Sequence, residues 1–591
     1  MKTRSWNRGV RVAMGAALVV TGWPLLAPWL PEHVPQPPAL AGAPAAVPGQ
    51  VVVDARDTLT PADLQALNSR YGLNLRYNSV HSTEEKLLIS DVPVGQEAAL
   101  LARLRQDPLV EAAEPMLQYS APPMERTPPP PPTPDTAKKP PRGWTPNDPR
   151  FAEQWNMSLI GAEEAWAQGA TGSGITVAVI DTGVAFEDDD KCYWATDFKG
   201  TRFVAGYDFV NDDAHPNDDN GHGTHVAGTI AETTDNGEGV AGLAYGARIM
   251  PLKVLSAWGS GTCADIADAI RFAADNGAKV INLSLGGSQP DAVMHLACKY
   301  AAGKGVLIVC AAGNSGGGPV GYPAAFKECL AVSSVGPKGE LAPYSSVGPQ
   351  VAIAAPGGDK SLGEQFGVLQ NTVLYDSGVR EDGYFAFQGT SMASPHVAAT
   401  AALAMSRGMT DTAEVRQLLQ RGATSKKPTK KYGAGILSAS KTVELADTAR
   451  RDSLLLLLFS VVAGFTGVGV GAIRRNVRGL ARFPFMPLGF VMGVLGPDLM
   501  LLWLGYGSPF NIVLHSALVP LYLLWEAESP AVRRFVAALA VGVALNLAWD
   551  AWRGVAPFAG VIASHAVPWL WVNAVVGVGV ALTAWRRSFA G

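Results

Sequence analysis

The sequence predicts an α/β domain of three layers over residues 145–445, with a parallel sheet between helices. Apolar runs without polar alternation, such as residues 176–180 and 279–285, are typical of buried parallel strands. Helical patterns separate these runs. Residues 262–276 place apolar side chains on one face, and Gly277 is a natural stop just beyond them. Strands that alternate with helices indicate a parallel sheet covered on both sides.

A smaller α+β domain is expected over residues 50–121. Its predicted order is strand, helix, strand, strand, helix, strand, at residues 51–54, 61–71, 73–78, 86–91, 96–106 and 110–117. This order is typical of a ferredoxin-like domain. Residues 122–144 follow as a linker, in which the unbroken run from Pro128 to Pro132 favours an extended, polyproline-like conformation.

The two ends of the chain carry apolar segments. Residues 1–41 combine basic residues, an apolar run and a small-residue site, as in a secretory signal peptide; an uncleaved anchor is the alternative. Residues 453–587 predict a transmembrane domain of about five helices, from long runs of low charge. The arginines between them favour an exported, multi-pass protein whose α/β domain lies outside the cytoplasmic membrane, with its C-terminal helices in lipid. The five predicted spans are residues 454–473, 487–506, 510–525, 535–549 and 567–585.

Charge and cysteine content exclude two classes of function. The chain has 47 Lys and Arg against 51 Asp and Glu, and this balance argues against nucleic acid as a partner. None of the five cysteines falls in a CxxC pair, so a cysteine-rich zinc site is not expected.

Three motifs supply the residue types of nucleophilic catalysis. The run VAVIDTG ends a buried strand near Asp181, NGHGTHVAG places His222 at a helix start, and GTSMASP places Ser391 before an apolar helix. Amide hydrolysis needs a nucleophile, a base and a group that orients the base. Ser391 can supply the nucleophile, His222 the base and Asp181 the orienting group. In a fourth motif, AAGN, the Asn314 side chain and the Ser391 backbone N–H could stabilise an oxyanion.

With these motifs, residues 145–445 resemble the subtilisin-like serine proteases, the subtilases of peptidase family S8, with calcium loops similar to those of thermitase-like members. The resemblance implies a calcium-stabilised endopeptidase that acts on protein or peptide substrates through an acyl-enzyme. It gives the four residues the same roles and makes His222, not His225, the base. Residues 50–121 resemble the inhibitory propeptide of the family. We therefore expect a zymogen inhibited by its own propeptide, which processes itself near or after the linker.

The resemblance also implies a cleft in which an extended peptide lies between two strand edges. A small residue, Gly321, is expected at the floor of the pocket for the P1 side chain, the residue before the cleaved bond. A glycine floor admits large apolar side chains, so we expect broad specificity. The edge residues are Ser284, Leu285, Gly286 and Gly287 on one side and Gly259, Ser260 and Gly261 on the other.

Two groups of oxygen-bearing side chains are expected to bind Ca²⁺, which prefers carboxylate and amide oxygens. In the first group, Asn211 stands where the family has Asp, which should weaken the site. In the second, an insertion before Asp197 departs from the family pattern. The groups are Asp208, Asn211, Asp213 and Asn217, and Asp148, Asp197 and Asn236.

Two other functions remain open from the sequence. One is a membrane-bound processing protease with a narrow substrate range, and the other is a non-catalytic scaffold that binds peptides. The complete set of four catalytic residues argues against the scaffold. The sequence does not determine the natural substrate, the P1 preference or the propeptide cleavage site.

Overall fold

The computed structural model divides into two compact units, residues 34–448 and a second unit made of residues 1–33 and 449–591, each described here by itself. Several predicted segments lie outside the described residues. They are the signal peptide, nearly all of the linker and the first three membrane spans, except for residues 522 and 523 of the third span. The described residues are 46–122, 144–188, 194–376, 379–450, 522–523, 530–553 and 566–587.

An eight-stranded parallel sheet organises the larger unit. Its order is β13-β12-β11-β10-β5-β8-β6, and β7 also pairs with β8. Every residue of β5, β10, β11 and β12 is buried, which explains their uninterrupted apolar sequences. The parallel α/β sheet predicted from the sequence is confirmed. The strands are β5 (Thr176–Asp181), β6 (Arg202–Phe203), β7 (Tyr207–Asp208), β8 (Arg248–Lys253), β10 (Val280–Leu283), β11 (Leu307–Ala311), β12 (Cys329–Val335) and β13 (Val351–Pro356).

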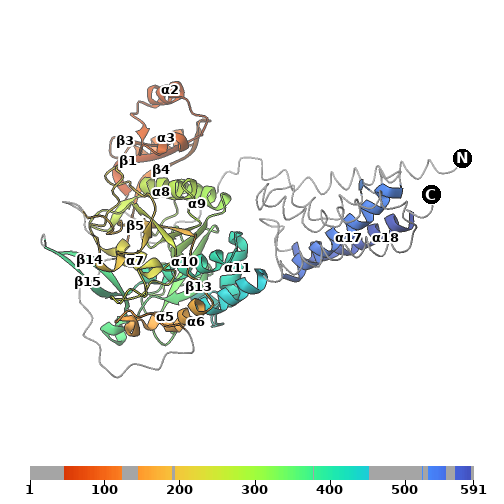
Figure 1. Ribbon diagram of the computed structural model, residues 1–591. Coiled ribbons are helices and arrows are strands. Elements are labelled where there is room, and N and C mark those ends of the chain that lie inside the picture. The colour runs from red at the N-terminus through yellow and green to blue at the C-terminus, as the bar shows by residue number, and fades with distance from the viewer. Residues whose placement is uncertain are drawn as a thin grey trace. The chain divides into compact units, whose positions relative to one another are not determined.

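Helices cover both faces of this sheet (Figure 1). Ala178 and Ile180 of β5 belong to an apolar cluster shared with α8 (Cys263–Asp275) and α9 (Ala292–Gly303). Because side chains alternate along a strand, Val179 and Asp181 face the opposite layer. That layer contains the helices α7 (His222–Ala231) and α10 (Thr390–Ser406), which pack against each other and against β5.

Shorter elements complete the larger unit. β14 and β15 form an antiparallel pair, and residues 439–450 are helical. The elements are α5 (Trp155–Ile160), α6 (Ala162–Ala167), α11 (Thr412–Gly422), α12 (Thr429–Tyr432), β14 (Val368–Asp376) and β15 (Val379–Phe387), with 3-10 turns at Phe151–Glu153, Thr196–Phe198, Lys360–Leu362 and Glu364–Phe366.

An antiparallel sheet of order β2-β3-β1-β4 forms the N-terminal domain, and β9 (Ser260–Thr262) of the α/β domain extends it. The elements occur in the order expected from the sequence, with the short α3 in addition. Helix α2 begins with a reciprocal capping interaction between Thr60 and Asp63 and ends at Gly72. The elements are β1 (Ala46–Ala55), α2 (Pro61–Tyr71), β2 (Arg76–Tyr77), α3 (Ser82–Glu85), β3 (Leu87–Asp91), α4 (Glu97–Leu104) and β4 (Val110–Ser120).

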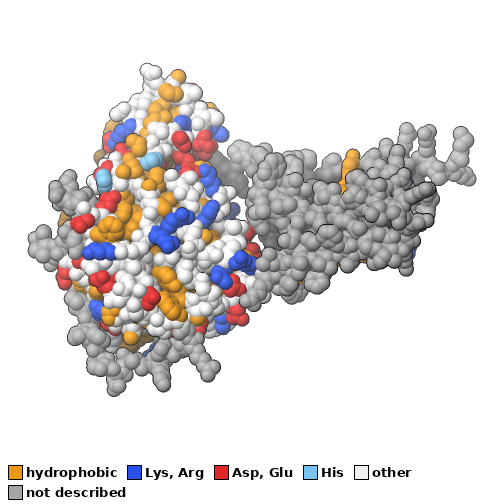
Figure 2. Space-filling model, in the orientation of Figure 1, with side chains coloured by type: hydrophobic (Ala, Val, Ile, Leu, Met, Phe, Trp, Pro, Cys, Tyr) orange, Lys and Arg blue, Asp and Glu red, His pale blue; other side chains and the backbone are white. Residues whose placement is uncertain are grey.

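The N-terminal domain packs on the layer formed by α8 and α9 (Figure 1). A buried ion pair and hydrogen bonds to a buried carboxylate hold it there. Nη2 of Arg271 lies 2.6 Å from Oδ2 of Asp54, and Oδ2 of Asp268 accepts hydrogen bonds from Asn78 and Ser79, each 2.9 Å long. On the face seen in Figure 2, side chains of both charges lie among one another.

The second unit contains two described helices, α17 (Pro530–Arg553) and α18 (Ala566–Arg587). Within the described part of the chain, no helix is both long and apolar enough to span a membrane. The prediction of a multi-pass protein with its C-terminal helices in lipid is therefore wrong. In α17 the reason is visible in the sequence: Arg534 and Asp550 confine the uncharged stretch to residues 535–549, which is shorter than the about 20 residues a span needs.

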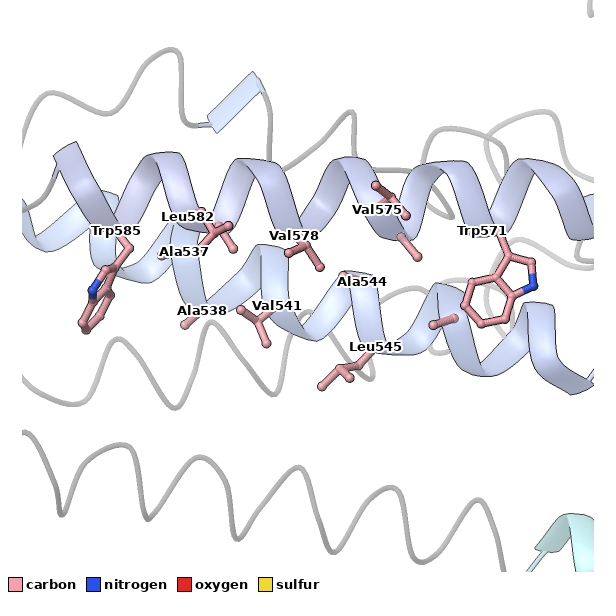
Figure 3. Close-up of a pocket in the computed structure, with 13 residues that line it drawn as sticks. Ala537, Ala538, Val541, Ala544, Leu545, Trp571, Val575, Val578, Leu582 and Trp585 are labelled. Atoms are coloured by element: carbon pink, nitrogen blue, oxygen red, sulfur yellow. The ribbon is translucent and has the colours of Figure 1, made fainter.

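An apolar cavity of about 510 Å³ lies along α17 and α18. Trp571 and Trp585 lie near its two ends, and valine, leucine and alanine side chains fill the wall between them (Figure 3).

Candidate functional site

The carboxylate and the imidazole of the predicted triad are in direct contact. Oδ1 of Asp181, at the end of β5, lies 2.7 Å from Nδ1 of His222, the first residue of α7. The helix can start there because Gly221 takes a φ of 110°, and a Cβ on it would lie 1.9 Å from the backbone O of Val373. Both side chains are buried, and no described residue bonds Nε2 of His222. That nitrogen is left to accept a proton.

The surroundings of His222 and His225 shift the pKa values of the two imidazoles in opposite directions. Burial by itself would lower the pKa of His222, but the charge of Asp181 and its hydrogen bond outweigh burial and raise it. Burial lowers the pKa of His225 to about 3, and its Nε2 lies 3.0 Å from the backbone O of Val368. Of the two, His222 has the environment of a general base.

Ser391 lies in the first turn of α10 and is joined to Ser284 by two hydrogen bonds. Oγ of Ser391 donates to the backbone O of Ser284 over 3.0 Å, and Oγ of Ser284 donates to the backbone O of Ser391 over 2.8 Å. The second bond is available because Pro395, one turn further along α10, has no N–H to offer the Ser391 carbonyl. In this arrangement the Ser391 hydroxyl points to Ser284 and not to His222.

Asn314 follows β11 and is held by a residue that sequence analysis did not identify. Its Oδ1 accepts hydrogen bonds from the backbone N and the Oγ1 of Thr390, at 3.0 and 2.9 Å. With Oδ1 fixed, the amide group is oriented, and Nδ2 is the group that can donate. Asn314 and Ser391 line the same cavity. Thr390 directly precedes Ser391 in the sequence, but that position alone does not indicate that Thr390 bonds Asn314.

A segment of the chain itself, residues 118–122, lies in the predicted cleft. Residues 118–120 pair antiparallel with β9, and the N–H of Ala121 donates to the backbone O of Gly259 over 2.9 Å. On the other side, Ser120 and Gly286 exchange two backbone hydrogen bonds of 3.3 and 3.1 Å. The predicted edge residues thus flank an extended segment: Gly259, Ser260 and Gly261 on one side, Ser284, Leu285, Gly286 and Gly287 on the other. The sequence pattern alone did not indicate that this segment would occupy the cleft.

A cavity of about 460 Å³ opens beside Ser391. Most of its lining surface is apolar, and small residues such as Ala312, Val320 and Gly321 contribute to it. A Cβ on Gly321 would lie 2.9 Å from the backbone O of Gly287, closer than side chains tolerate, so glycine keeps this wall open. The cavity can receive a sizeable apolar side chain.

The second predicted calcium group comes together. Nδ2 of Asn236 donates to Oδ1 of Asp197 over 2.8 Å, and Asp148 accepts from the backbone N–H of Asp235 over 2.8 Å. Burial raises the pKa of Asp197 to about 7 and also raises those of Asp148 and the adjacent Glu232. Buried carboxylates at this density favour a cation. No cluster of three or more His, Cys, Asp or Glu side chains suited to a metal occurs among the described residues, so backbone and amide oxygens would have to complete the site.

The first predicted calcium group lies in a loop where Asp208 and Asp213 exchange two backbone hydrogen bonds, of 2.9 and 3.1 Å. Asp208 is bonded to Asn211, whose Nδ2 lies 2.8 Å from its Oδ2. Oδ1 of Asp213 accepts from the backbone N–H of His215, and Nδ2 of Asn217 donates to Glu187 over 2.6 Å. Two of the four side chains thus contact each other, while those of Asp213 and Asn217 have partners outside the group.

Comparisons with known proteins place the chain in a family. The Subtilase family model matches residues 172–435. A protein named Thermophilic serine proteinase, from Bacillus sp. (strain AK1), is 38% identical over 331 residues, which cover 56% of this chain and 71% of that protein. Thermitase from Thermoactinomyces vulgaris is 38% identical over 303 residues, or 51% of this chain and all of that protein.

Among solved structures, the chain is similar to fervidolysin from Fervidobacterium pennivorans, described as a keratinolytic enzyme related to subtilisin. The TM-score is 0.56 at 24% identity, over 70% of this chain and 64% of that one. At this identity the likeness supports the fold.

Proposed function

The chain belongs to the subtilase family of serine endopeptidases, and from this premise we propose that Ser391, His222, Asp181 and Asn314 carry out its peptide-bond hydrolysis. The observation that carries the proposal is the 2.7 Å contact between Asp181 and His222, with Nε2 of the same imidazole unbonded by any described residue.

In the first half of the reaction, Oγ of Ser391 attacks the substrate carbonyl carbon while its proton passes to Nε2 of His222. Asp181 holds Nδ1 and stabilises the imidazolium that forms. The developing oxyanion receives hydrogen bonds from Nδ2 of Asn314 and the backbone N–H of Ser391. The imidazolium then gives its proton to the leaving amine, the C–N bond breaks, and an ester to Ser391 remains. Water hydrolyses this acyl-enzyme with the same base.

Protein and peptide substrates bind as an extended strand between the edges at residues 259–261 and 284–287. The apolar cavity beside Ser391 receives the P1 side chain. Gly321 leaves the cavity open, and the described residues that line it include no Asp or Glu. We therefore expect large apolar P1 residues and broad specificity.

Calcium has a structural role in this proposal. Asp148, Asp197 and Asn236 would hold it, since two of them are buried carboxylates whose charge needs a cation. With an ion bound there, these carboxylates would be neutralised and would hold the loop at residues 233–240 to the rest of the domain. The group around Asp208 is a weaker candidate, because Asn211 supplies an amide where the family has a carboxylate and Asn217 already donates to Glu187.

The N-terminal domain acts as the inhibitory propeptide of a zymogen. Its last strand continues into the cleft, where residues 118–122 occupy the path of a substrate. We expect processing near or after the linker to release it.

Labelling with a fluorophosphonate probe, which reacts with activated serines, tests the proposal. Wild-type protein should be labelled and should cleave casein, and Ser391→Ala should lose both. A folded and processed wild-type protein that is neither labelled nor able to cleave casein would refute it. Ser394→Ala is a matched control: Ser394 lies one turn along the same helix, and its loss should leave labelling intact.

A further inference from the structure

The ladder between residues 118–122 and the α/β domain fixes which residue reaches Ser391. Ser120 and Gly286 exchange both of their backbone hydrogen bonds. In an antiparallel ladder such pairs recur every second residue on each strand, so the next pair in this register is residue 122 with residue 284. Pro122 does line the cavity that Ser391 and Asn314 share. The bond after Pro122 is therefore the one that this register presents to the nucleophile.

Proline at this position breaks the ladder. The backbone O of Ser284 should accept an N–H from residue 122, but Pro122 has none. The Ser391 hydroxyl takes the vacant acceptor instead, at 3.0 Å, while no described residue bonds Nε2 of His222. A hydroxyl that donates to Ser284 is not donating to its base, so the nucleophile is not activated.

The next residue in the sequence is also proline. Cleavage here would form an ester between Ser391 and Pro122 and expel the Pro123 nitrogen, which must receive the proton from His222. That nitrogen belongs to a tertiary amide whose ring carbon stands where other residues carry hydrogen.

We propose that Pro122 and Pro123 make segment 118–122 a cleavage-resistant occupant of the cleft, so that the chain inhibits itself with a bond it does not cut and is processed at another bond. The inference rests on the proposed peptidase function. It assigns these two prolines as the residues that decide whether the bound segment is an inhibitor or a substrate.

The test compares the full-length wild-type chain with Pro122→Leu/Pro123→Ser. The leucine restores the N–H for Ser284 and offers the cavity an apolar side chain. N-terminal sequencing and intact mass should reveal a new N-terminus at position 123 in this variant and none there in wild type. The cut should disappear when Ser391→Ala is added, and its rate should not depend on protein concentration, as expected for cleavage within one chain. Pro122→Ala/Pro123→Ala removes both rings without a large side chain and should gain the same cut, which guards against a folding defect in the first variant.

The outcomes separate the inference from the function it rests on. Cleavage of wild type between residues 122 and 123 would overturn the inference. So would the absence of this cut in both double variants, if they are labelled by the fluorophosphonate probe. If no folded variant is labelled or cleaves casein, the proposed function falls and the inference falls with it.

Discussion

Replacing Arg271 by methionine should loosen the N-terminal domain in a pH-dependent way. Nη2 of Arg271 lies 2.6 Å from Oδ2 of Asp54, and its Nε lies 3.4 Å from Glu85, at the buried contact between the two domains. Asp54 is only 1% exposed. Without Arg271, its carboxylate must either stay charged in an apolar contact or take up a proton.

The size of the effect follows from the pKa of Asp54. Burial raises it to about 7, although Arg271 acts to lower it. A free aspartate has a pKa of about 3.9, so docking is coupled to proton uptake. Because its pKa is raised in the docked state, Asp54 stabilises docking at low pH. This stabilisation decreases as the pH rises from about 4 toward 7.

In Arg271→Met the lowering influence is gone, and the pKa of Asp54 lies higher still. Below pH 7 both proteins dock with Asp54 protonated, and they should differ little. Above pH 7, only the variant continues to lose free energy of docking. The loss is about 1.4 kcal/mol per pH unit, which lowers the docking equilibrium constant by a factor of about ten. The loss is bounded by the about 3–5 kcal/mol that breaking a buried ion pair costs.

The assay is the rate at which a fluorophosphonate probe labels Ser391 in the uncleaved chain, because the probe must wait for residues 118–122 to leave the cleft. The ratio of the variant's rate to the wild-type rate cancels the pH dependence of the chemistry. It should be near one at pH 6 and rise about tenfold per unit above pH 7. Arg248 is an exposed arginine whose guanidinium donates to the backbone O of Gly174, and Arg248→Met should leave the ratio at one. Asp54→Asn combined with Arg271→Met should recover most of the protection. A ratio that does not change with pH would refute the reasoning.

Three further predictions concern the mature enzyme. Asn314→Ala should lower kcat by about 10²–10³, the effect measured for the corresponding amide in subtilisin, with little change in KM; an unchanged kcat would exclude its oxyanion role. Catalysis needs neutral His222, whose pKa is raised above 6.5, so kcat/KM should fall on the acid side with a midpoint above that value. Asp181→Asn should move this midpoint down as well as reduce kcat, and a midpoint that stays in place would contradict the assigned pairing. A calcium chelator should lower the melting temperature of wild type, while Asp197→Asn should start lower and respond less; equal responses would argue against calcium at this position.

Local sequence was sufficient to predict where Asp181 and His222 lie, because each stands at the end of a regular element. Asp181 closes a fully buried strand, and the glycine before His222 marks a helix start, so type and position could be read from motifs. The α/β sheet was predictable for the same reason, because parallel strands buried on both faces have uninterrupted apolar sequences. The predicted membrane spans show the limit of composition. An apolar run does not by itself identify what surrounds it: α17 and α18 bury only part of their apolar surface against each other.

The tertiary structure decided what depends on register and on contacts distant in the chain. Thr390 orients Asn314 from 76 residues away, and the group of Asp148, Asp197 and Asn236 assembles from three separate segments of the chain. The role proposed for Pro122 depends on the pairing of Ser120 with Gly286. This pairing places a residue without an N–H opposite the backbone O of Ser284, which instead accepts the hydroxyl of Ser391. A sequence motif shows which side-chain groups are present at which positions. Which hydrogen-bond acceptor each group reaches is set by the strand register, which only the packed domains fix.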